Sequence, residues 1–343
     1  MNTIQTILQT VIQHQNLTTP QMSEIMRLIM QGKVSATQLS AFLVAMRMKG
    51  ETVSELVAAC KVLQEFADPV IVKNKTLIDI VGTGGDQTHT FNISTASSFV
   101  VAAAGATVAK HGNRSVSSRC GSADVLEKAG VKLTLTPTQI ATCINKLNIG
   151  FMFAQLHHPA MQHAAAARKE LGFRTFFNLI GPLTNPAAAK KQLIGVFAKE
   201  WVLPTAEILQ QLGSKHALVV HSVDGLDEIS ISADTFFAEL KQGKITTGTL
   251  TAQQFGFNIS ALTTLQVADA TESFAILQQA LQNKPGAARD IVALNAGAAI
   301  YVAGLANDIA SGVKQAQQLL ANGAAYEKLK QLIALTQSLA TES

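Results

Sequence analysis

The chain has 343 residues, of which 48% are hydrophobic and 15% are charged, and its formal net charge is +4. This length suits one large or two ordinary domains with a substantial core. The positive charge is spread without a dense Lys/Arg run, which argues against a nucleic-acid-binding or membrane-binding surface and suits anionic small substrates.

The first 67 or so residues predict short amphipathic helices. Apolar side chains repeat at helical spacing at the start of the chain, at Ile4, Ile7, Leu8, Val11 and Ile12. Thr19 followed by Pro20 predicts an N-cap with proline at the first helical position. Two capping boxes follow: Ser35 with Gln38, opening a helix that ends near Gly50, and Thr52 with Glu55. Four short helices cannot bury all their apolar side chains, so we expect them to pack on another part of the chain or on a second subunit.

From Thr76 onward, strand-like runs alternate with helical ones. The strand-like runs are residues 77–81, 107–110, 131–135, 149–153, 193–197 and 217–221. The helical runs between them are residues 94–104, 122–129, 137–147, 160–171 and 202–212. This alternation predicts an α/β fold with a mostly parallel sheet, whose ligand lies beyond the C-terminal ends of the strands. Residues 229–265 suggest antiparallel hairpins, and residues 271–339 suggest helices broken near Pro285 and Gly304.

A glycine-rich loop follows the first predicted strand. Gly82, Gly84 and Gly85 allow positive φ and a close approach of backbone N–H groups to a ligand. The N-terminus of the next helix favours an anion, and three polar side chains add donors or a metal ligand: Asn92, Ser94 and Thr95. The loop matches neither the Walker A motif nor the strict GxGxxG pattern. It therefore indicates a phosphate or diphosphate site, although a plain βα turn would look the same.

Two further segments follow predicted strands. Lys110 to Ser118 brings together two cations, an amide and serine hydroxyls that suit an anion, although a solvated polar loop is the alternative. Asp224 to Glu228 ends in the pair Asp227-Glu228, which could hold Mg²⁺ or simply form a solvated turn.

A last segment carries a candidate acceptor-binding cation. Arg168 lies late on a predicted helix and could bind a carboxylate with both arms of its guanidinium, although a surface arginine is the simpler interpretation. His157-His158 suggests a metal, but no third ligand has the spacing that zinc requires. No Cys-His or Ser-His-Asp arrangement points to a nucleophile.

These motifs occur in the order found in the anthranilate phosphoribosyltransferase family, which the chain resembles over nearly its whole length. The motifs are Gly82–Asp86, Asn92–Thr95, Lys110–Arg114 with Ser117-Ser118, Gly121–Glu127, Arg174–Asn178 with Gly181–Pro186, and Asp227-Glu228. The combination is specific, whereas the glycine loop alone also occurs in pyrimidine nucleoside phosphorylases.

The resemblance implies the fold and the reaction. It implies a helical domain over residues 1–70, joined by helices from about 160–190, and an α/β domain over residues 74–343 of the nucleoside phosphorylase/phosphoribosyltransferase-like type. It also implies a homodimer formed through the helical part. The reaction would be transfer of phosphoribosyl from 5-phosphoribosyl 1-diphosphate to anthranilate, in tryptophan biosynthesis.

The resemblance also implies the site residues, with no catalytic nucleophile. The donor would be held by Gly82, Gly85, Asp86, Thr90, Asn92, Ile93, Ser94, Thr95, Lys110, His111, Gly112, Asn113, Arg114, Ser115, Val116, Ser117, Ser118 and Ser122. Anthranilate would be contacted by Gly82, Asn113 and Arg168. Two Mg²⁺ ions per subunit are expected, one on Ser94 and Glu228 and the other on Asp227 and Glu228.

Two other functions fit parts of the pattern. A pyrimidine nucleoside phosphorylase of the same fold would need no acidic Mg²⁺ pair, so Asp227-Glu228 and Asn113-Arg114 argue against it. A non-catalytic nucleic-acid-binding relative would show degraded metal ligands and a basic groove, whereas here the ligands are present and the charge is mild.

Cysteine usage and the start of the chain favour a cytoplasmic protein without a membrane partner. The three cysteines lack metal or redox spacing, and a sparse, odd number fits a reducing compartment. Residues 1–15 have polar residues interspersed throughout and lack the apolar centre of a secretion signal.

Overall fold

The computed structural model describes residues 4–74, 76–85, 88–114 and 120–341. Four helices form the start of the chain and are called here the N-terminal bundle: α1 (Ile4–Ile12), α2 (Thr19–Met30), α3 (Ala36–Lys49) and α4 (Val53–Glu65). The two predicted capping boxes, at Ser35 and Thr52, are confirmed. The start of α2 was predicted one residue too late. Thr18 is the N-cap because Gln21 completes its capping box, which Met22 could not do for Thr19.

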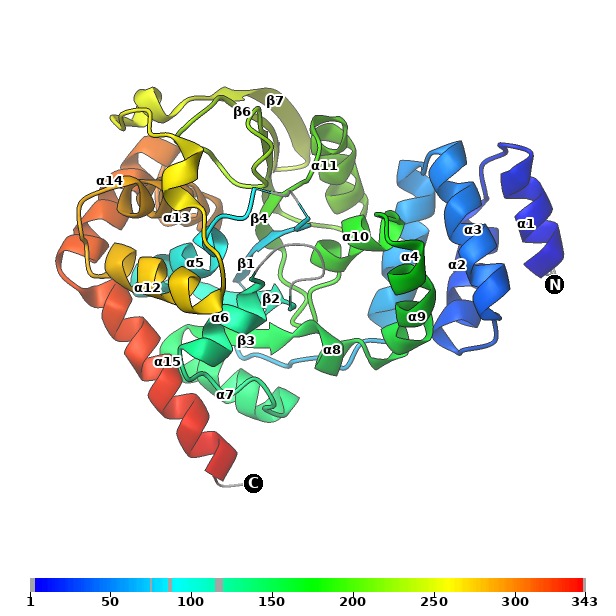
Figure 1. Cartoon of the computed structure of the whole chain (residues 1–343), viewed down its shortest axis with the longest axis horizontal. Helices are drawn as coiled ribbons and strands as arrows, with labels where there is room; N and C mark the ends of the chain where they lie inside the picture. Colours follow the sequence, from blue (N-terminus) through cyan, green and yellow to red (C-terminus); the bar gives the residue numbers. More distant parts are fainter. Residues whose placement is uncertain (1–3, 75, 86–87, 115–119, 342–343) are drawn as a thin grey trace.

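The apolar faces of the N-terminal bundle are covered by later parts of the chain. The same hydrophobic core contains side chains of α9 (Gln162–Leu171), α10 (Phe176–Ile180) and α11 (Val202–Gln211). Phe42 of α3 meets Phe176 of α10 edge to face, with ring centroids 6.1 Å apart. Figure 1 shows α10 between the N-terminal bundle and the sheet, and α9 packs against α3 and α2 of the bundle. The chain itself therefore buries much of the apolar surface that four short helices leave over.

One seven-stranded sheet forms the centre of the larger part, in the order β3-β2-β1-β4-β5-β6-β7. The strands are β1 (Leu77–Gly82), β2 (Thr107–Gly112), β3 (Ile149–Phe153), β4 (Lys191–Gly195), β5 (His216–Ser222), β6 (Thr235–Lys241) and β7 (Lys244–Leu250). The first five are parallel, and β6 and β7 add an antiparallel hairpin at one edge. The α/β class with a mostly parallel sheet is thus confirmed.

Two details of the predicted strands were wrong. The alternating run at residues 131–135 is not a strand, because its buried side chains pack beside α15 (Ala324–Thr341) and the Lys132 amide donates to Thr336 of that helix. Residues 229–265 contain one hairpin, not several. After β7 the chain forms two short 3₁₀ turns, η4 (Ala252–Phe255) and η5 (Leu262–Leu265).

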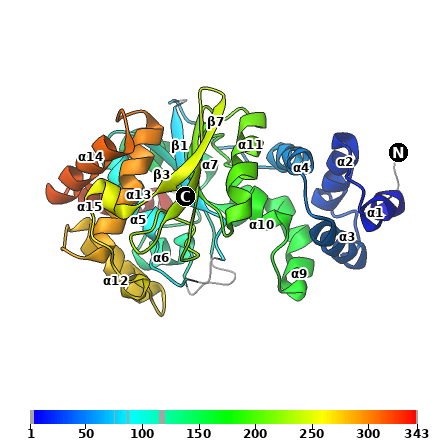
Figure 2. The same cartoon turned by 90° about the horizontal axis from the view of Figure 1, so that it is seen from above.

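Helices cover both faces of the sheet. One face carries α5 (Ile93–Ala103), α6 (Ser122–Lys128), α7 (Pro137–Leu147), α12 (Ala270–Leu281), α13 (Ala287–Ala303), α14 (Ile309–Ala321) and α15. The other face carries α10 and α11 and continues into the N-terminal bundle. Shorter elements connect them: α8 (Ala154–His157), η1 (Pro159–Met161), η2 (Gly181–Leu183) and η3 (Lys199–Trp201). Figure 2 shows the bundle at one end of the molecule and α14 and α15 at the other.

The strand order places a crevice beside β1. The chain runs from β1 outward to β2 and β3, then returns to add β4 on the opposite side of β1. Ligands of open α/β sheets bind at such a reversal, beyond the carboxyl ends of the strands. In addition, β1 pairs with β2 only at Leu77 and Ile78, whereas its ladder with β4 continues to Gly82. The sheet therefore opens between β1 and β2 at the edge where the ligand is expected.

Candidate active site

The glycine loop (residues 82–85) leaves β1 at the open edge of the sheet. Gly84 and Gly85 have φ of 65° and 71°, which a side chain would disfavour. The Gly84 amide donates to Asp227 Oδ2 at 2.8 Å, so the loop is joined to the acidic segment after β5. Asp86 lies outside the described residues. The chain is held again at Thr90, which bridges to Gln266.

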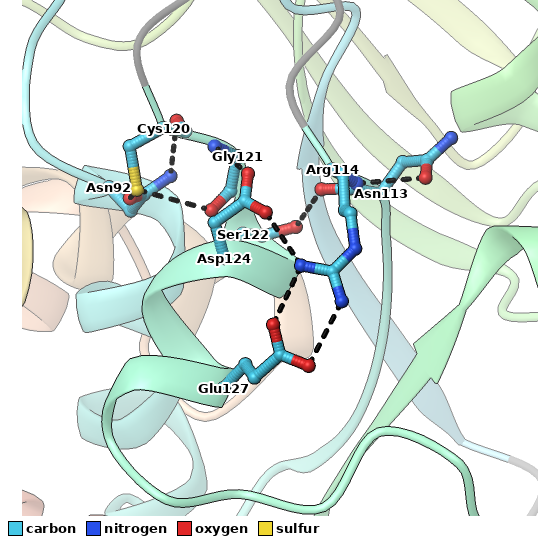
Figure 3. Close-up of polar contacts among 8 residues, drawn as sticks. All are labelled: Asn92, Asn113, Arg114, Cys120, Gly121, Ser122, Asp124 and Glu127. Atoms are coloured by element: carbon cyan, nitrogen blue, oxygen red, sulfur yellow. Dashed lines mark hydrogen bonds and ion pairs between the residues drawn. The ribbon is translucent and has the colours of Figure 1, made fainter. Parts of the chain in front are cut away.

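The N-terminus of α5 follows this loop. Its N-cap, Asn92, makes no side-chain bond to the first helical N–H groups, so these donors and the helix dipole suit an anion. The Asn92 amide is instead used within the protein. It donates to the Cys120 carbonyl at 3.3 Å and accepts from Ser273 Oγ at 2.8 Å, and its Cys120 contacts are visible in Figure 3. These contacts fix the start of α5, and a contact of Asn92 with the ligand stays a prediction.

Asp227 is packed between the ends of two neighbouring strands. A Cβ atom on Gly82 would lie 2.3 Å from Asp227 Oδ2, and one on Gly195 would lie 1.3 Å from the Asp227 carbonyl oxygen. Either methyl group would collide with the acidic segment. Glycine at the ends of β1 and β4 is therefore required for Asp227 to reach the centre of the crevice.

Ser94, Asp227 and Glu228 line one small cavity with Asn295 of α13. Asn295 Oδ1 accepts from the Ile229 amide at 2.9 Å, and Asn295 Nδ2 donates to the Ile229 carbonyl at 2.8 Å. These two bonds hold the acidic segment in place. The predicted metal ligands are thus brought together. Among the described residues no three His, Cys, Asp or Glu side chains form a complete metal cage. The hydroxyl and carboxylate oxygens of Ser94, Asp227 and Glu228 suit Mg²⁺, which binds through one or two carboxylates, waters and substrate phosphates.

Lys110 supplies a buried positive charge at the same place. Its Nζ donates to the Ile80 carbonyl at 2.6 Å and to Ser94 Oγ at 3.4 Å, and only 3% of the residue is exposed. Burial lowers the pKa of Lys110 to about 8, while Asp79, Glu228 and Asp227 oppose that shift. The side chain remains mostly protonated at neutral pH, and its Nζ bonds to two residues that line the cavity, Ile80 and Ser94.

The Lys110 loop, defined here by residues 110–114, ends at an arginine with a different environment. The Arg114 guanidinium binds Glu127 with both arms, at 2.7 and 2.9 Å, and Asp124 at 2.9 Å (Figure 3). The hydrogen bonds that Arg114 donates to Glu127 and Asp124 raise its pKa. Of the two cations predicted for this segment, Lys110 therefore contacts Ser94 at the cavity, and Arg114 is paired with acidic side chains of α6. Ser115, Val116, Ser117 and Ser118 lie outside the described residues.

The backbone beside Arg114 is also attached to α6. The Asn113 carbonyl accepts from Ser122 Oγ at 3.3 Å and from the Ala123 amide at 3.2 Å, while the Asn113 side chain is exposed. A Cβ on Gly112 would lie 2.2 Å from Ser122 Oγ, so this close approach needs glycine. Ser122 thus acts here as a clamp on the loop.

Arg168 lies on α9, near the N-terminal bundle, with its guanidinium carbon 5.3 Å from the centre of the Phe177 ring. Burial lowers its pKa, and no carboxylate within the described ranges pairs with it. No hydrogen bond among those residues joins it to the Lys110–Asp227 group either. The structure therefore brings Ser94, Lys110, Asp227 and Glu228 together, and leaves Arg168 as a separate, half-buried cation.

A pair of buried histidines lies next to the Lys110 loop. The rings of His111 and His158 are 5.3 Å apart, and His158 Nε2 lies 3.1 Å from the Thr184 carbonyl oxygen. Burial lowers the pKa of His158 to about 4 and that of His111 well below its usual value. Both imidazoles are neutral at physiological pH, so the histidine pair adds no positive charge to the site.

Asp79 is a site residue that the sequence analysis missed. It is fully buried within β1 and accepts from the His111 amide at 3.1 Å and from Asn185 Nδ2 at 2.7 Å. Burial raises the pKa of Asp79 to about 6, which leaves the carboxylate ionised at neutral pH. The available signal was a single carboxylate inside an otherwise apolar strand, Leu77-Ile78-Asp79-Ile80-Val81.

Comparison with known proteins gives a consistent result over both parts of the chain. Residues 74–326 match the model described as "Glycosyl transferase family, a/b domain", and residues 5–67 match the helical bundle domain of the same family. An anthranilate phosphoribosyltransferase of Methylococcus capsulatus is 53% identical over 334 residues, which cover 97% of this chain and 98% of that protein.

Solved structures agree with these matches. The crystal structure of anthranilate phosphoribosyltransferase from Thermus thermophilus has a TM-score of 0.92 and 40% identity, over 98% of this chain and 100% of that chain. The Saccharomyces cerevisiae enzyme in complex with PRPP and Mg has a TM-score of 0.90 at 24% identity, over 98% of each chain, and shares the fold.

Proposed function

This chain belongs to the anthranilate phosphoribosyltransferase family, and we infer that it transfers the phosphoribosyl group of 5-phosphoribosyl 1-diphosphate to anthranilate. The products are N-(5-phosphoribosyl)anthranilate and diphosphate, and the reaction belongs to tryptophan biosynthesis. Identity of 53% over nearly the full length of both proteins supports the same reaction. The comparisons support neither the nucleoside phosphorylase nor the nucleic-acid-binding alternative.

The shared cavity of Ser94, Asp227 and Glu228 beside Lys110 is the observation that carries the donor site. Oxygen ligands, a buried ammonium group and the uncapped N-terminus of α5 meet at the carboxyl edge of the sheet. A diphosphate ester with its Mg²⁺ needs this combination, whereas a nucleoside alone does not. We place the donor between the glycine loop and the Lys110 loop.

The other predicted donor residues take part in different ways. The backbone N–H groups of Ser94 and Thr95 at the start of α5 suit the donor's anionic oxygens. Those of Ile93, Thr83 and Gly84 donate within the protein, to Phe91, Gly195 and Asp227. Thr90, Asn92, Arg114 and Ser122 support this surface from behind through the contacts described above. Asp86 and residues 115–118 remain predictions from the sequence.

Two Mg²⁺ ions per subunit remain the proposal, one on Ser94 and Glu228 and one on Asp227 and Glu228. The oxygen-only donor set fits this metal. Bound Mg²⁺ would neutralise charge on the diphosphate and so improve it as a leaving group. The Gly84 amide and Asn295 hold the acidic segment still, so its carboxylates need little rearrangement to bind.

The acceptor chemistry explains why no nucleophile or strong base stands out. An aromatic amine is neutral at pH 7 and can attack the sugar carbon directly, so the protein needs to position the two substrates and stabilise charge. We propose that Arg168 binds the anthranilate carboxylate and that Gly82 and Asn113 line the acceptor side. A guanidinium without a carboxylate partner among the described residues supports this role.

Homodimer formation through the N-terminal bundle and a cytoplasmic location are also proposals. Ile12 of α1 and Met48 of α3 are 57% and 71% exposed, which leaves apolar surface for a second subunit. The three cysteines are free and buried, as expected in a reducing compartment. Among the described helices, none combines the length and apolar character needed to cross a bilayer.

The reaction is tested by following diphosphate release in the presence of Mg²⁺. We expect release from 5-phosphoribosyl 1-diphosphate to depend on anthranilate. Thymidine with inorganic phosphate serves as the competing substrate pair. Cleavage of thymidine without anthranilate-dependent release would assign the chain to the phosphorylase reaction instead.

A further inference from the structure

The sheet is held open between β1 and β2 by side chains in place of backbone hydrogen bonds. The last paired residues of β1 and β2 are Ile78 and Val108. Yet β2 continues to pair with β3 as far as Gly112, and β1 continues to pair with β4 as far as Gly82. Each strand thus stays paired with its other neighbour, while β1 and β2 separate from each other.

Three backbone groups along this separation bond to side chains. Asp79 accepts from the His111 amide at 3.1 Å, and Asn185 Nδ2 donates to the Ala109 carbonyl at 2.8 Å. On the other strand the Ile80 carbonyl accepts from Lys110 Nζ at 2.6 Å. Side chains therefore replace the strand partners on both sides of the gap.

Asp79 and Asn185 form the centre of this arrangement. Asn185 Nδ2 donates to Asp79 Oδ2 at 2.7 Å, and Asn185 Oδ1 accepts from the Ala187 amide at 2.9 Å, which fixes the orientation of the amide group. Asp79 is 0% exposed and Asn185 is 6% exposed. A buried carboxylate persists only where donors surround it, and here an amide N–H, a side-chain amide and the nearby Lys110 charge do so.

The separation has a direct consequence for the donor site. The glycine loop continues from β1, and the Lys110 loop continues from β2. In an unbroken ladder these two strand ends would lie about 4.8 Å apart, which leaves no room for a ligand between them. The width of the gap therefore sets the distance between the two loops that are proposed to bind the donor.

Asn185 also connects this gap to the acceptor side. Asn185 lies in the segment that leads from α10 to β4. Helix α10 packs on the N-terminal bundle and carries Phe177, the aromatic neighbour of Arg168. The same amide thus contacts β1 through Asp79 and β2 through Ala109. Movement of the α10–β4 segment would change the donor gap.

We propose that Asp79 is a positioning residue which, together with Asn185, holds β1 and β2 apart and thereby sets the separation of the two donor-binding loops. The proposal rests on the function proposed above. Asp79 acts through the His111 amide and Asn185, and touches neither substrate.

The test is a charge-swap series: Asp79→Asn, Asn185→Asp and the double variant. Asp79→Asn places two side-chain amides against each other. Asp79 and Asn185 together make four contacts: one between themselves, and one each with His111, Ala109 and Ala187. At least one of these contacts fails in the variant. We expect the KM for 5-phosphoribosyl 1-diphosphate to rise about ten- to hundredfold, the range of one buried hydrogen bond to a charged group, with a smaller change in the KM for anthranilate. Asn185→Asp places a second carboxylate against that of Asp79, so we expect a larger rise in the KM for the donor.

The double variant restores a donor facing an acceptor between positions 79 and 185, but a carboxylate oxygen then faces the Ala109 carbonyl where Asn185 Nδ2 donated. Its KM for the donor should be lower than that of Asn185→Asp. Gln192→Leu is the matched control, because Gln192 lies opposite Asp79 on β4, is 2% exposed and donates to the Pro182 carbonyl outside the gap. This control should lower the melting temperature without raising the KM for the donor.

Two results would overturn the proposal while the wild-type protein remains active. One is an unchanged donor KM in Asp79→Asn; the other is a change confined to melting temperature, as in the control. If the variants do not fold, hydrogen exchange of the wild type decides. The His111 amide should exchange far more slowly than in an unstructured peptide, and rapid exchange would contradict its bond to Asp79. A wild-type protein without transferase activity would refute the proposed function instead.

Discussion

Arg168 shows how a single side chain can indicate a ligand. Its guanidinium is half-buried and stacked near Phe177, and no carboxylate of the described residues neutralises it. Partial burial of a cation without such a partner has a cost that a bound carboxylate would offset. The side chain is therefore best explained by the acceptor that it is proposed to bind.

Replacement of Arg168 by alanine should affect the two substrates unequally. We expect the KM for anthranilate to rise about tenfold or more, the usual contribution of a charged hydrogen bond, with little change for the donor. Steady-state kinetics with each substrate varied in turn measures this. Arg27→Ala, which removes an exposed arginine paired with Glu65 on the N-terminal bundle, is the control. Equal increases for both substrates would contradict carboxylate recognition.

Glu127 tests what Arg114 does. If Arg114 positions the Lys110 loop by its hold on α6, Glu127→Gln should raise the KM for the donor by up to about fivefold, because partly exposed ion pairs contribute about 0–1 kcal/mol. Glu127 is 55% exposed in its side chain, so folding should be little affected. A lower donor KM in this variant would mean that Glu127 competes with the donor for Arg114.

At the scale of elements, α4 is fixed by one buried carboxylate. Glu55 accepts from Lys49 Nζ at 2.9 Å, from the Thr52 amide at 2.8 Å and from the Leu17 amide at 2.7 Å. The capping box was visible in the sequence, but the ion pair and the bond to Leu17 were not. This single side chain joins α4 to the end of α3 and to the α1–α2 connection.

Loss of that carboxylate should destabilise the protein strongly. Glu55→Ala leaves Lys49 buried without its partner, and we expect a loss of about 3–5 kcal/mol in the free energy of unfolding. Glu65→Ala removes an exposed pair and should cost about 0–1 kcal/mol. Denaturant unfolding of both variants measures the difference. Similar small losses would show that the buried pair does not hold the bundle together.

The end of β4 should be intolerant of any side chain. In Gly195→Ala the new methyl group collides with the Asp227 backbone, so we expect weaker Mg²⁺ dependence and loss of most activity. Gly248→Ala is the control, since its Cβ would lie 2.8 Å from the Phe237 ring on the distant β6–β7 hairpin. Titration of activity with Mg²⁺ compares the two. An unchanged Mg²⁺ dependence in Gly195→Ala would contradict the placement of Asp227.

The elements could largely be predicted from the sequence because their signals are local. Capping boxes, proline positions and apolar periodicity identified α3, α4 and α7 and nearly all strands of the parallel sheet. Residues 131–135 misled the prediction because alternation also occurs where an extended segment packs on a helix, here α15.

The gap between β1 and β2 could not be predicted in this way. Asp79 and Asn185 are 106 residues apart in the chain, so their contact depends on the complete fold. Likewise, the ion pair between Arg114 and Glu127 could not be read from the sequence. Motifs identify which residue types are present, whereas their partners follow from tertiary structure.

At the scale of the whole molecule, the parts cooperate at one edge of the sheet. The glycine loop, the Lys110 loop and Asp227-Glu228 surround the proposed donor site, while α9 and α10 carry the proposed acceptor side against the N-terminal bundle. Asn185 lies on the segment between them. This arrangement explains catalysis by positioning and charge stabilisation without a covalent intermediate.

The most direct test of this account is the fluorescence of anthranilate in a mixture of the protein, Mg²⁺ and 5-phosphoribosyl 1-diphosphate. We expect a continuous loss of fluorescence that stops when the protein, the donor or Mg²⁺ is omitted. Stable fluorescence in the complete mixture, with a folded protein, would contradict the central claim.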